Sequence, residues 1–426
     1  MLAPVMVVSL AVLVYFARWR WRLGAGSVFG LVVLLSRSIV DLGSASSGNV
    51  LPSLQLSAAI GVLSVLACTW MVFFDRNWLK LSWFAVPIAG IVFGTFVGIY
   101  NFGIELPLIQ ESFRLISILA ITAIAGIAAK IESKDSLQSL ILSSICFPGC
   151  ALLLGAFLGF KEMTQAGGRA AGTFSHPNAA GAFFALGCLL SLHYVVYERK
   201  KFAFIVSIIS LSAVVLSQSL GSLIGVLLGF TVAILFSPAL STARKWFLSF
   251  VAMSVSVSLL SFTSLSGRIS GQPGSLPTFS LNGDAGDSLQ WRLLNWSLLL
   301  SKLKESPLLG FGLGTTTNFI EPLGGPPHSM PIQITLETGL CGFICFCLLI
   351  GLFVVRVYRS NHIDSKNKAL LLGIIVFAAV NGAESNLMDY TATDYLIAFA
   401  VGVSTAGQKP TNGALDFESP AKIRII

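Results

Sequence analysis

Charged residues are scarce in this sequence of 426 residues, since only 11% are Asp, Glu, Lys or Arg. Soluble globular proteins carry about 25%. Hydrophobic residues make up 55% instead, in runs such as AAIGVLSVLACTWMVFF and FAFIVSIISLSAVVL. Such runs approach the length of about 20 residues that crosses a bilayer as a helix. Because lipid cannot hydrogen-bond to the backbone, spanning segments are helical. The low charge therefore excludes a soluble globule and predicts an all-α polytopic membrane protein with 12–13 transmembrane helices.

Paired cysteine motifs are also lacking. The seven cysteines lie inside apolar runs, and no two of them form a C-x-x-C motif. This pattern argues against a disulfide framework or a zinc site. We expect the cysteines to be buried, small hydrophobic side chains.

Lys and Arg are missing from alternate connections between the apolar runs. The connections 41–53, 100–111, 218–219 and 389–391 contain none, whereas the intervening ones hold 19 of the 27 basic residues. This positive-inside pattern assigns the basic connections to the cytoplasm. The net charge of +8 thus reflects topology rather than nucleic-acid binding. The candidate spans are 2–17, 24–40, 54–74, 81–99, 112–129, 137–160, 176–196, 202–217, 220–236, 246–262, 331–355, 369–388 and 392–406.

The same alternation places the longest connection, 263–330, outside the cytoplasm. We expect N-terminal transmembrane helices in 1–262, this extracytoplasmic loop, C-terminal transmembrane helices in 331–406 and a cytoplasmic tail at 407–426.

Eight basic residues remain on the outer side of the membrane or buried near it. Because Lys and Arg otherwise concentrate on the cytoplasmic side, each of the eight is a candidate for a structural or functional role. Intrahelical pairs are sufficient for two of them, because Arg37 precedes Asp41 by four residues and Arg114 follows Glu111 by three. Anion binding stays open for both. The eight are Arg37, Arg114, Lys161, Arg169, Arg268, Arg292, Lys302 and Lys304.

The segment GGRAAGTFSHPNAAG enters a span from the outside. Arg169 would lie near the interface, where it could bind an anion or reach a lipid headgroup. We expect Asn178 to cap the following helix. His176 is expected to be a loop or capping residue, with contact to substrate as the alternative.

Within the long loop, DSLQWRLLNWSLLLSKL (287–303) predicts a helix capped by Asp287 or Ser288, lying at the membrane interface or against the bundle. Arg292 stands one turn before Trp296, so it could make a cation–π contact or hold an anion. The glycines of LLGFGLGTTTNF (308–319) favour a tight turn that brings backbone close to a substrate or a helix.

The segment GGPPHSMPIQITLETG (324–339) places His328, one of four histidines, where the long loop re-enters the membrane. Glu337, inside the apolar run, could pair with a buried cation. Glu384, Asp389 and Asp394 could form an acidic patch at the last outer turn and supply a base if His328 does not.

Three of these segments together resemble the O-antigen ligase and O-antigen polymerase superfamily. They are GRAAGTFSHPNAAG, WRLLNWSLLLSKLKESPLLGFGLG and HSMPIQITLETGLCG, in the family's order around the same long outer loop. The similarity covers about residues 165–345. One departure is Leu220 after Ser219, where the family often has arginine, so another cation such as Arg37 would supply that charge.

The resemblance implies a GT-C-like glycosyltransferase of the bacterial cytoplasmic membrane with its active site facing the periplasm. Its donor would be a glycan on undecaprenyl pyrophosphate, and its acceptor lipid A–core or another glycan; no cofactor would be needed. Arg169, Arg292 and Arg37 would bind the pyrophosphate, and His328 would be catalytic, supported by Glu337, His176 and Trp296. The outer loop contains no carboxylate cluster with metal spacing, so we expect a metal-independent reaction.

Three alternatives to ligation remain. A repeat-unit polymerase shares the same signatures. A flippase for the lipid-linked glycan would also explain many spans and scattered cations, although the halves show no convincing repeat. A non-catalytic scaffold for polysaccharide export is a further possibility.

Overall fold

The computed structural model describes residues 82–160, 163–165, 168–262, 288–319 and 327–406, with a few isolated positions between 30 and 66. The expected spans 2–17, 24–40 and 54–74 lie wholly or largely outside the described residues. So do Arg37, the first part of the long loop and the tail from residue 407.

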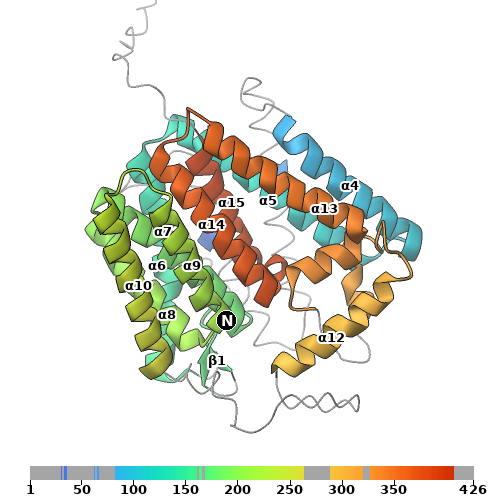
Figure 1. The fold of residues 1–426 in the computed structure, drawn as a ribbon. Coiled ribbons are helices and arrows are strands. Elements are labelled where there is room, and N and C mark those ends of the chain that lie inside the picture. Colours follow the sequence, from blue (N-terminus) through green and yellow to red (C-terminus); the bar gives the residue numbers. More distant parts are fainter. Residues whose placement is uncertain are drawn as a thin grey trace, which may run out of the picture.

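Every span predicted from residue 81 onward coincides with a helix (Figure 1). The described part of the long loop contributes one more α-helix, α12. A two-stranded antiparallel pair of very short strands, β1 and β2, precedes α7. The elements are α4 Ser82–Phe102, α5 Leu106–Ile131, α6 Lys134–Leu158, β1 Thr164–Gln165, β2 Arg169–Ala170, α7 Pro177–Glu198, α8 Lys201–Ser217, α9 Leu220–Leu235, α10 Thr242–Phe262, α12 Ser288–Leu303, η2 Thr315–Phe319, α13 Met330–Arg359, α14 Ser365–Glu384, η3 Leu387–Asp389 and α15 Thr391–Thr405.

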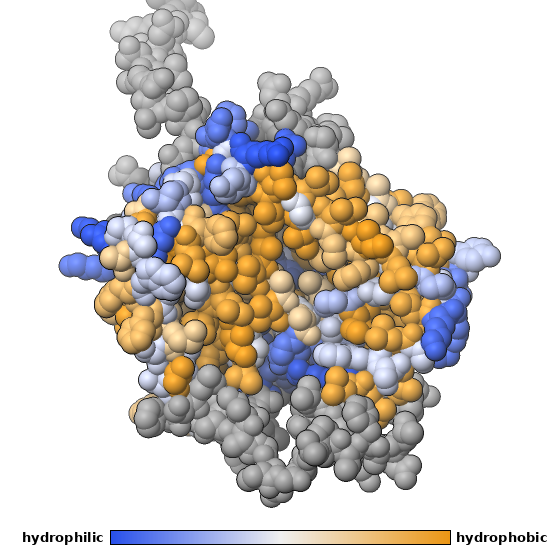
Figure 2. Space-filling view, viewed as in Figure 1, coloured by the Kyte–Doolittle hydropathy of each residue, from blue (hydrophilic) through white to orange (hydrophobic). Residues whose placement is uncertain are grey.

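Within the described part of the chain, 6 helices are long and apolar enough to cross a membrane: α4, α5, α6, α7, α13 and α14. The shorter helices α8 and α9 are also apolar. Figure 2 shows a broad hydrophobic face bordered by more hydrophilic margins, as expected for helices whose outer sides meet lipid. These features confirm the all-α polytopic membrane fold, while the total of 12–13 spans remains a prediction.

The start of α5 differs most from the expected span, because the helix begins at Leu106 rather than at residue 112. Its first turns contain polar side chains, which a search for apolar residues does not detect. Arg114 pairs with Glu111 on this same helix, as the spacing predicted, and its Nη1 also lies 4.0 Å from Asp394 of α15.

Small residues allow the central helices to pack closely. Helix α7 is buried along most of its length, and Phe183 and Phe184 are completely enclosed. Helices α9 and α14 meet backbone to backbone, since a Cβ atom added to Gly229 would lie 2.7 Å from the carbonyl oxygen of Gly373. Close approach at small residues is a common source of packing energy between membrane helices.

The connections between helices separate into two ends of the bundle. At one end, Lys134 Nζ lies 2.6 Å from Glu198, which joins the connection after α5 to the end of α7. Lys200 lies 2.8 Å from Asp135 at the same end. At the other end, Asn318 donates to Glu105 at 3.1 Å, joining the long loop to the connection before α5. The grouping agrees with the alternation of basic and uncharged connections.

Gly339 interrupts α13, because its φ of 67° and ψ of −175° are not helical. The interruption exposes backbone groups, and in a bilayer such groups need partners. The glycine-rich segment after α12 provides them. The bonds are Phe311 N–H to the Leu336 carbonyl (3.0 Å), Gly312 N–H to the Glu337 carbonyl (2.8 Å), Leu340 N–H to the Pro307 carbonyl (2.9 Å) and Cys341 N–H to the Leu308 carbonyl (3.2 Å). The expectation that these glycines bring backbone against a helix is confirmed.

Replacement of Gly339 should destabilise this junction. In Gly339→Ala the new Cβ would lie 2.2 Å from the Leu308 carbonyl oxygen, and alanine disfavours positive φ. We expect a loss of about 3 kcal/mol in the free energy of unfolding, measured as a lower Tm in detergent. Gly351→Ala on the same helix is the control, because a Cβ there meets nothing within 4 Å. Equal Tm values for the two variants would contradict the prediction.

The cysteines differ in part from expectation. Cys188 is buried, as predicted, but Cys341, Cys345 and Cys347 are exposed on α13. The expectation of burial is wrong for these three because their helix face points away from the bundle.

Candidate functional site

Arg292 of α12 reaches the end of α14. Its Nη1 donates to the Glu384 backbone carbonyl at 2.7 Å and to the Glu384 carboxylate oxygen Oε1 at 3.0 Å. The arginine side chain is only 13% exposed, whereas that of Glu384 is 34% exposed. Arg292 thus has an anionic partner within the chain, the Glu384 carboxylate.

Two tryptophans of α12 contact the segment that carries His328. The rings of Trp291 and His328 lie with centroids 5.6 Å apart, and the Trp296 indole N–H donates to the Pro327 carbonyl. His328 itself has a φ of 48°, in the left-handed region that histidine adopts more readily than most residues. The two tryptophans therefore fix the backbone and the ring at the point where the long loop joins α13.

The surroundings of His328 favour a neutral imidazole. Burial and the nearby Arg292 guanidinium lower the pKa of His328, and Glu384 partly opposes this shift. Both charged groups thus act electrostatically on the histidine. We call Arg292, His328 and Glu384 the outer charge cluster.

Arg169 donates hydrogen bonds to the end of α8 and to the first turn of α7. Its Nε donates to the Ser217 carbonyl at 3.1 Å, and its Nη2 donates to Asn178 Oδ1 at 2.5 Å. The carbonyl and the amide orient the guanidinium. An arginine held in this way is suited to binding an anion.

The turn between α8 and α9 lies between Arg169 and the outer charge cluster. Arg169 contacts Ser217 at the end of α8. Glu384 packs against the first turn of α9, since a Cβ atom added to Gly221 would lie 2.2 Å from Glu384 Oε2. The structure therefore brings Arg169, Arg292 and His328 to the same end of the bundle, whereas Arg37 is outside the described residues.

The cap of α7 is His176 rather than Asn178. His176 Nδ1 accepts from the Asn178 backbone N–H at 3.1 Å, which agrees with the capping role expected for the histidine. The cap predicted for Asn178 is wrong, because Asn178 is the second residue of the helix and its side chain accepts from Arg169 instead.

Among the described residues, Glu337 lies in a buried polar network rather than beside a cation. Its Oε1 accepts from Thr316 Oγ1 at 2.8 Å and from Gln333 Nε2 at 3.0 Å. Asn386 donates to Gln333 Oε1 and, at 2.6 Å, to Asp389 Oδ2. The sequence analysis did not identify Gln333 and Asn386 as site residues. An amide within an apolar segment is nevertheless a pattern that could have indicated them. The network joins the first turns of α13, which follow His328, to the segment that follows Glu384.

The acidic side chains near the last outer turn have separate partners. Glu384 pairs with Arg292, Asp394 lies near Arg114, and Asp389 accepts from Asn386. Burial raises the pKa of Asp389 to about 6. The expected patch is therefore divided, and Glu384 is its member within reach of Arg292 and His328.

Fold and site together define a polytopic α-helical membrane protein with arginine and histidine side chains gathered at one end. Residues 205–347, about a third of the chain, match the family described as O-antigen ligase. The chain is thus similar to this family over those residues, which contain the second and third of the three segments, and the resemblance drawn from them is confirmed there. Arg292 and His328 lie inside the match, and Arg169 and Glu384 lie outside it.

Two curated relatives agree with the family match. Proteins of Rickettsia conorii and Rickettsia felis, both provisionally named as polysaccharide ligases, are 26% and 27% identical to this chain over 183 residues. The aligned segment covers 40% of this chain and 42% of each relative. The similarity therefore spans less than half the length of the relatives.

Proposed function

We propose that this protein transfers a glycan from undecaprenyl pyrophosphate to an acceptor hydroxyl on the periplasmic side of the bacterial cytoplasmic membrane. The family match and the relatives' names support ligation, and the acceptor in our proposal is lipid A–core. The observation that carries the proposal is the outer charge cluster, in which Arg292 holds a carboxylate beside His328.

The leaving group in this reaction is a lipid diphosphate. When the bond between sugar C1 and the phosphate oxygen breaks, negative charge grows on the diphosphate. The planar guanidinium group of arginine donates paired hydrogen bonds to phosphate oxygens, and it stays charged when it is partly buried. Arg292 already holds a carboxylate oxygen at 3.0 Å, so a phosphate oxygen could take that place. Arg169 would add a second positive charge, and no metal ion is required in this scheme.

The acceptor is an alcohol, whose oxygen attacks C1 more readily as its proton is removed. His328 would take that proton, because a neutral imidazole is a competent base near neutral pH. Its lowered pKa keeps the ring unprotonated and ready to accept. Glu384 would stabilise the imidazolium that forms.

The proposal includes the sidedness of the chain. Residues 1–262 and 331–406 would form the membrane bundle, residues 263–330 the extracytoplasmic loop, and residues 407–426 a cytoplasmic tail. Labelling of a cysteine placed at position 328 by an impermeant thiol reagent in intact spheroplasts tests this assignment.

Reconstitution tests the activity itself. Purified protein in vesicles should join the glycan of its undecaprenyl-pyrophosphate donor to lipid A–core, with release of undecaprenyl pyrophosphate. Product made only with a second lipid-linked repeat unit would indicate a polymerase. Donor that changes leaflet without any new glycosidic bond would indicate a flippase and overturn the proposal.

Loss of the Trp296 N–H should weaken transfer without removing the site. Trp296→Phe keeps the aromatic packing but leaves the buried Pro327 carbonyl without this donor. An unsatisfied buried carbonyl costs about 1–3 kcal/mol, so we expect kcat to fall about tenfold as His328 shifts. Trp246→Phe, at an exposed position on α10, is the control. Unchanged kcat in both variants would show that Trp296 does not position the histidine.

A further inference from the structure

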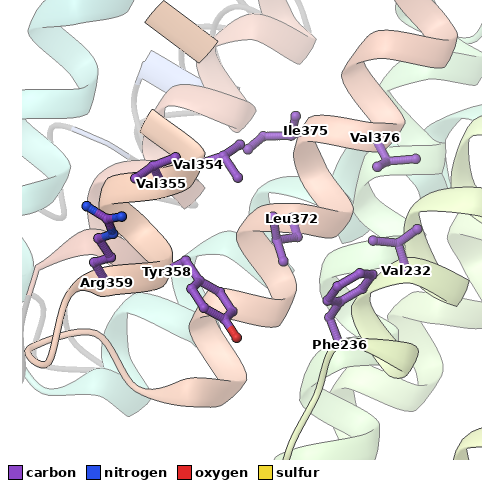
Figure 3. Close-up of a pocket in the computed structure, with 9 residues that line it drawn as sticks. All are labelled: Val232, Phe236, Val354, Val355, Tyr358, Arg359, Leu372, Ile375 and Val376. Carbon is purple, nitrogen blue, oxygen red and sulfur yellow. The ribbon is translucent and has the colours of Figure 1, made fainter. Parts of the chain in front are cut away.

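An apolar groove lies between α9, α13 and α14, away from the outer charge cluster. Its volume is about 710 Å³, and Figure 3 shows aliphatic side chains of the three helices along it. They include Val232 of α9, Val354 of α13, and Leu372, Ile375 and Val376 of α14.

The groove opens on surfaces that face lipid. Neighbouring positions of α13 carry large exposed apolar side chains, such as Leu348 (60% exposed) and Leu352 (65% exposed). An apolar cavity left empty would forfeit dispersion contacts on one side. Its natural occupant in a bilayer is therefore a hydrocarbon chain.

A cation lines one end of the groove. Arg359, the last residue of α13, is exposed and forms no hydrogen bond or ion pair with any residue of the described ranges. Lys368 brings a second positive charge close by, since its Nζ donates to the Tyr358 carbonyl at 2.9 Å. Helices α9 and α13 both end here, so the cations stand where a lipid headgroup would lie.

We propose that this groove binds an anionic phospholipid of the cytoplasmic leaflet, with one acyl chain between α9, α13 and α14 and the phosphate at Arg359. Basic side chains next to the cytoplasmic ends of spans attract anionic lipids by about 1 kcal/mol each. The donor's diphosphate does not fit this end. At 1.5 Å per residue, Leu372 lies about 18 Å along α14 from Glu384 of the outer charge cluster.

The bound lipid would support α13. Few residues of the membrane-crossing part of this helix are buried by protein. An acyl chain in the groove would fill the space between α13 and α14. If the proposed function holds, the lipid would also steady the helix that follows His328.

Native mass spectrometry of the full chain in detergent, with phosphatidylglycerol or phosphatidylcholine of the same acyl chains, tests the headgroup. We expect one phosphatidylglycerol to be retained preferentially. Arg359→Gln should weaken its retention about fivefold. Lys201→Gln, an exposed cation at the same end of the bundle, should leave it unchanged. Equal retention of both lipids, or equal loss in both variants, would overturn the proposal.

A second pair of variants tests the chain-binding part. Val354→Trp should fill the groove and reduce phosphatidylglycerol retention about tenfold. Leu348→Trp on the exposed surface of the same helix should not. Retention that survives Val354→Trp would refute binding in the groove. If undecaprenyl phosphate were retained through Arg359 and phosphatidylglycerol were not, the groove would hold the carrier lipid and the proposal would fail. None of these readouts depends on transfer activity.

Discussion

Arg292→Gln should lower kcat for glycan transfer by about 10²–10³-fold. A single well-placed donor to developing negative charge commonly contributes this much. Arg292→Lys should reduce kcat less than Arg292→Gln does but should not restore it fully. The lysine ammonium keeps the positive charge but lacks the paired N–H donors of the guanidinium. Initial rates with saturating lipid-linked donor and acceptor, in vesicles of fixed composition, measure both effects.

Two variants separate this role from a structural one. Glu384→Gln removes the ion pair but leaves the arginine charge, so it should reduce the rate less than Arg292→Gln does. Lys302→Gln, an exposed cation on the same helix, should leave the rate unchanged. If Arg292→Gln retained full activity, or if Glu384→Gln abolished it while Arg292→Gln did not, the arginine would not bind the leaving group.

His328→Asn should reduce kcat by about 10²–10⁴-fold, the usual contribution of a general base. Asparagine is the appropriate replacement because it tolerates the left-handed φ of 48° that position 328 requires. His362→Asn, at an exposed histidine outside the site, is the control. Activity of His328→Asn within threefold of the wild type would exclude the histidine as the base.

The pH profile gives an independent measure of the same group. The pKa of His328 is lowered from its ordinary value of about 6.5, so the ring is already neutral at pH 7. Activity should therefore stay constant as the pH falls from 7 to 6.5. It should decline only when the pH falls further, through the lowered pKa of His328. Arg292→Gln removes a repulsive cation, so the acid limb of its residual activity should move to higher pH. An acid limb that stays in place would contradict this coupling.

Apolar runs and the distribution of Lys and Arg were enough to predict the membrane class, the helices from residue 81 onward and their grouping at two ends. Periodicity alone missed the start of α5, because Gln110 and Glu111 interrupt the apolar pattern. Glu111 is accommodated by its ion pair with Arg114 within the helix. The interruption of α13 at Gly339 was also missed. Its backbone partners come from a segment about 30 residues earlier, and local sequence does not show such a pairing.

The candidate site was predicted unevenly. Arg169, Arg292 and His328 stood out because cations and titratable rings are rare on the outer side of a membrane protein. The pairing of Arg292 with Glu384 joins residues 92 positions apart, so spacing could not indicate it. Asn386 and Gln333 were overlooked for a different reason, because neutral amides attract little attention until tertiary contacts bury them.

The interruption at Gly339 has a consequence for bilayers of different thickness. Beyond Cys341, α13 continues to Arg359 with few protein neighbours, whereas the part up to Cys341 is bound to the segment after α12 by backbone hydrogen bonds. A membrane segment adjusts to a thicker or thinner hydrocarbon layer mainly by changing its tilt. The part of α13 that leads to Arg359 can therefore change its tilt to match the surrounding lipid, while His328, Trp291 and Trp296 keep their positions.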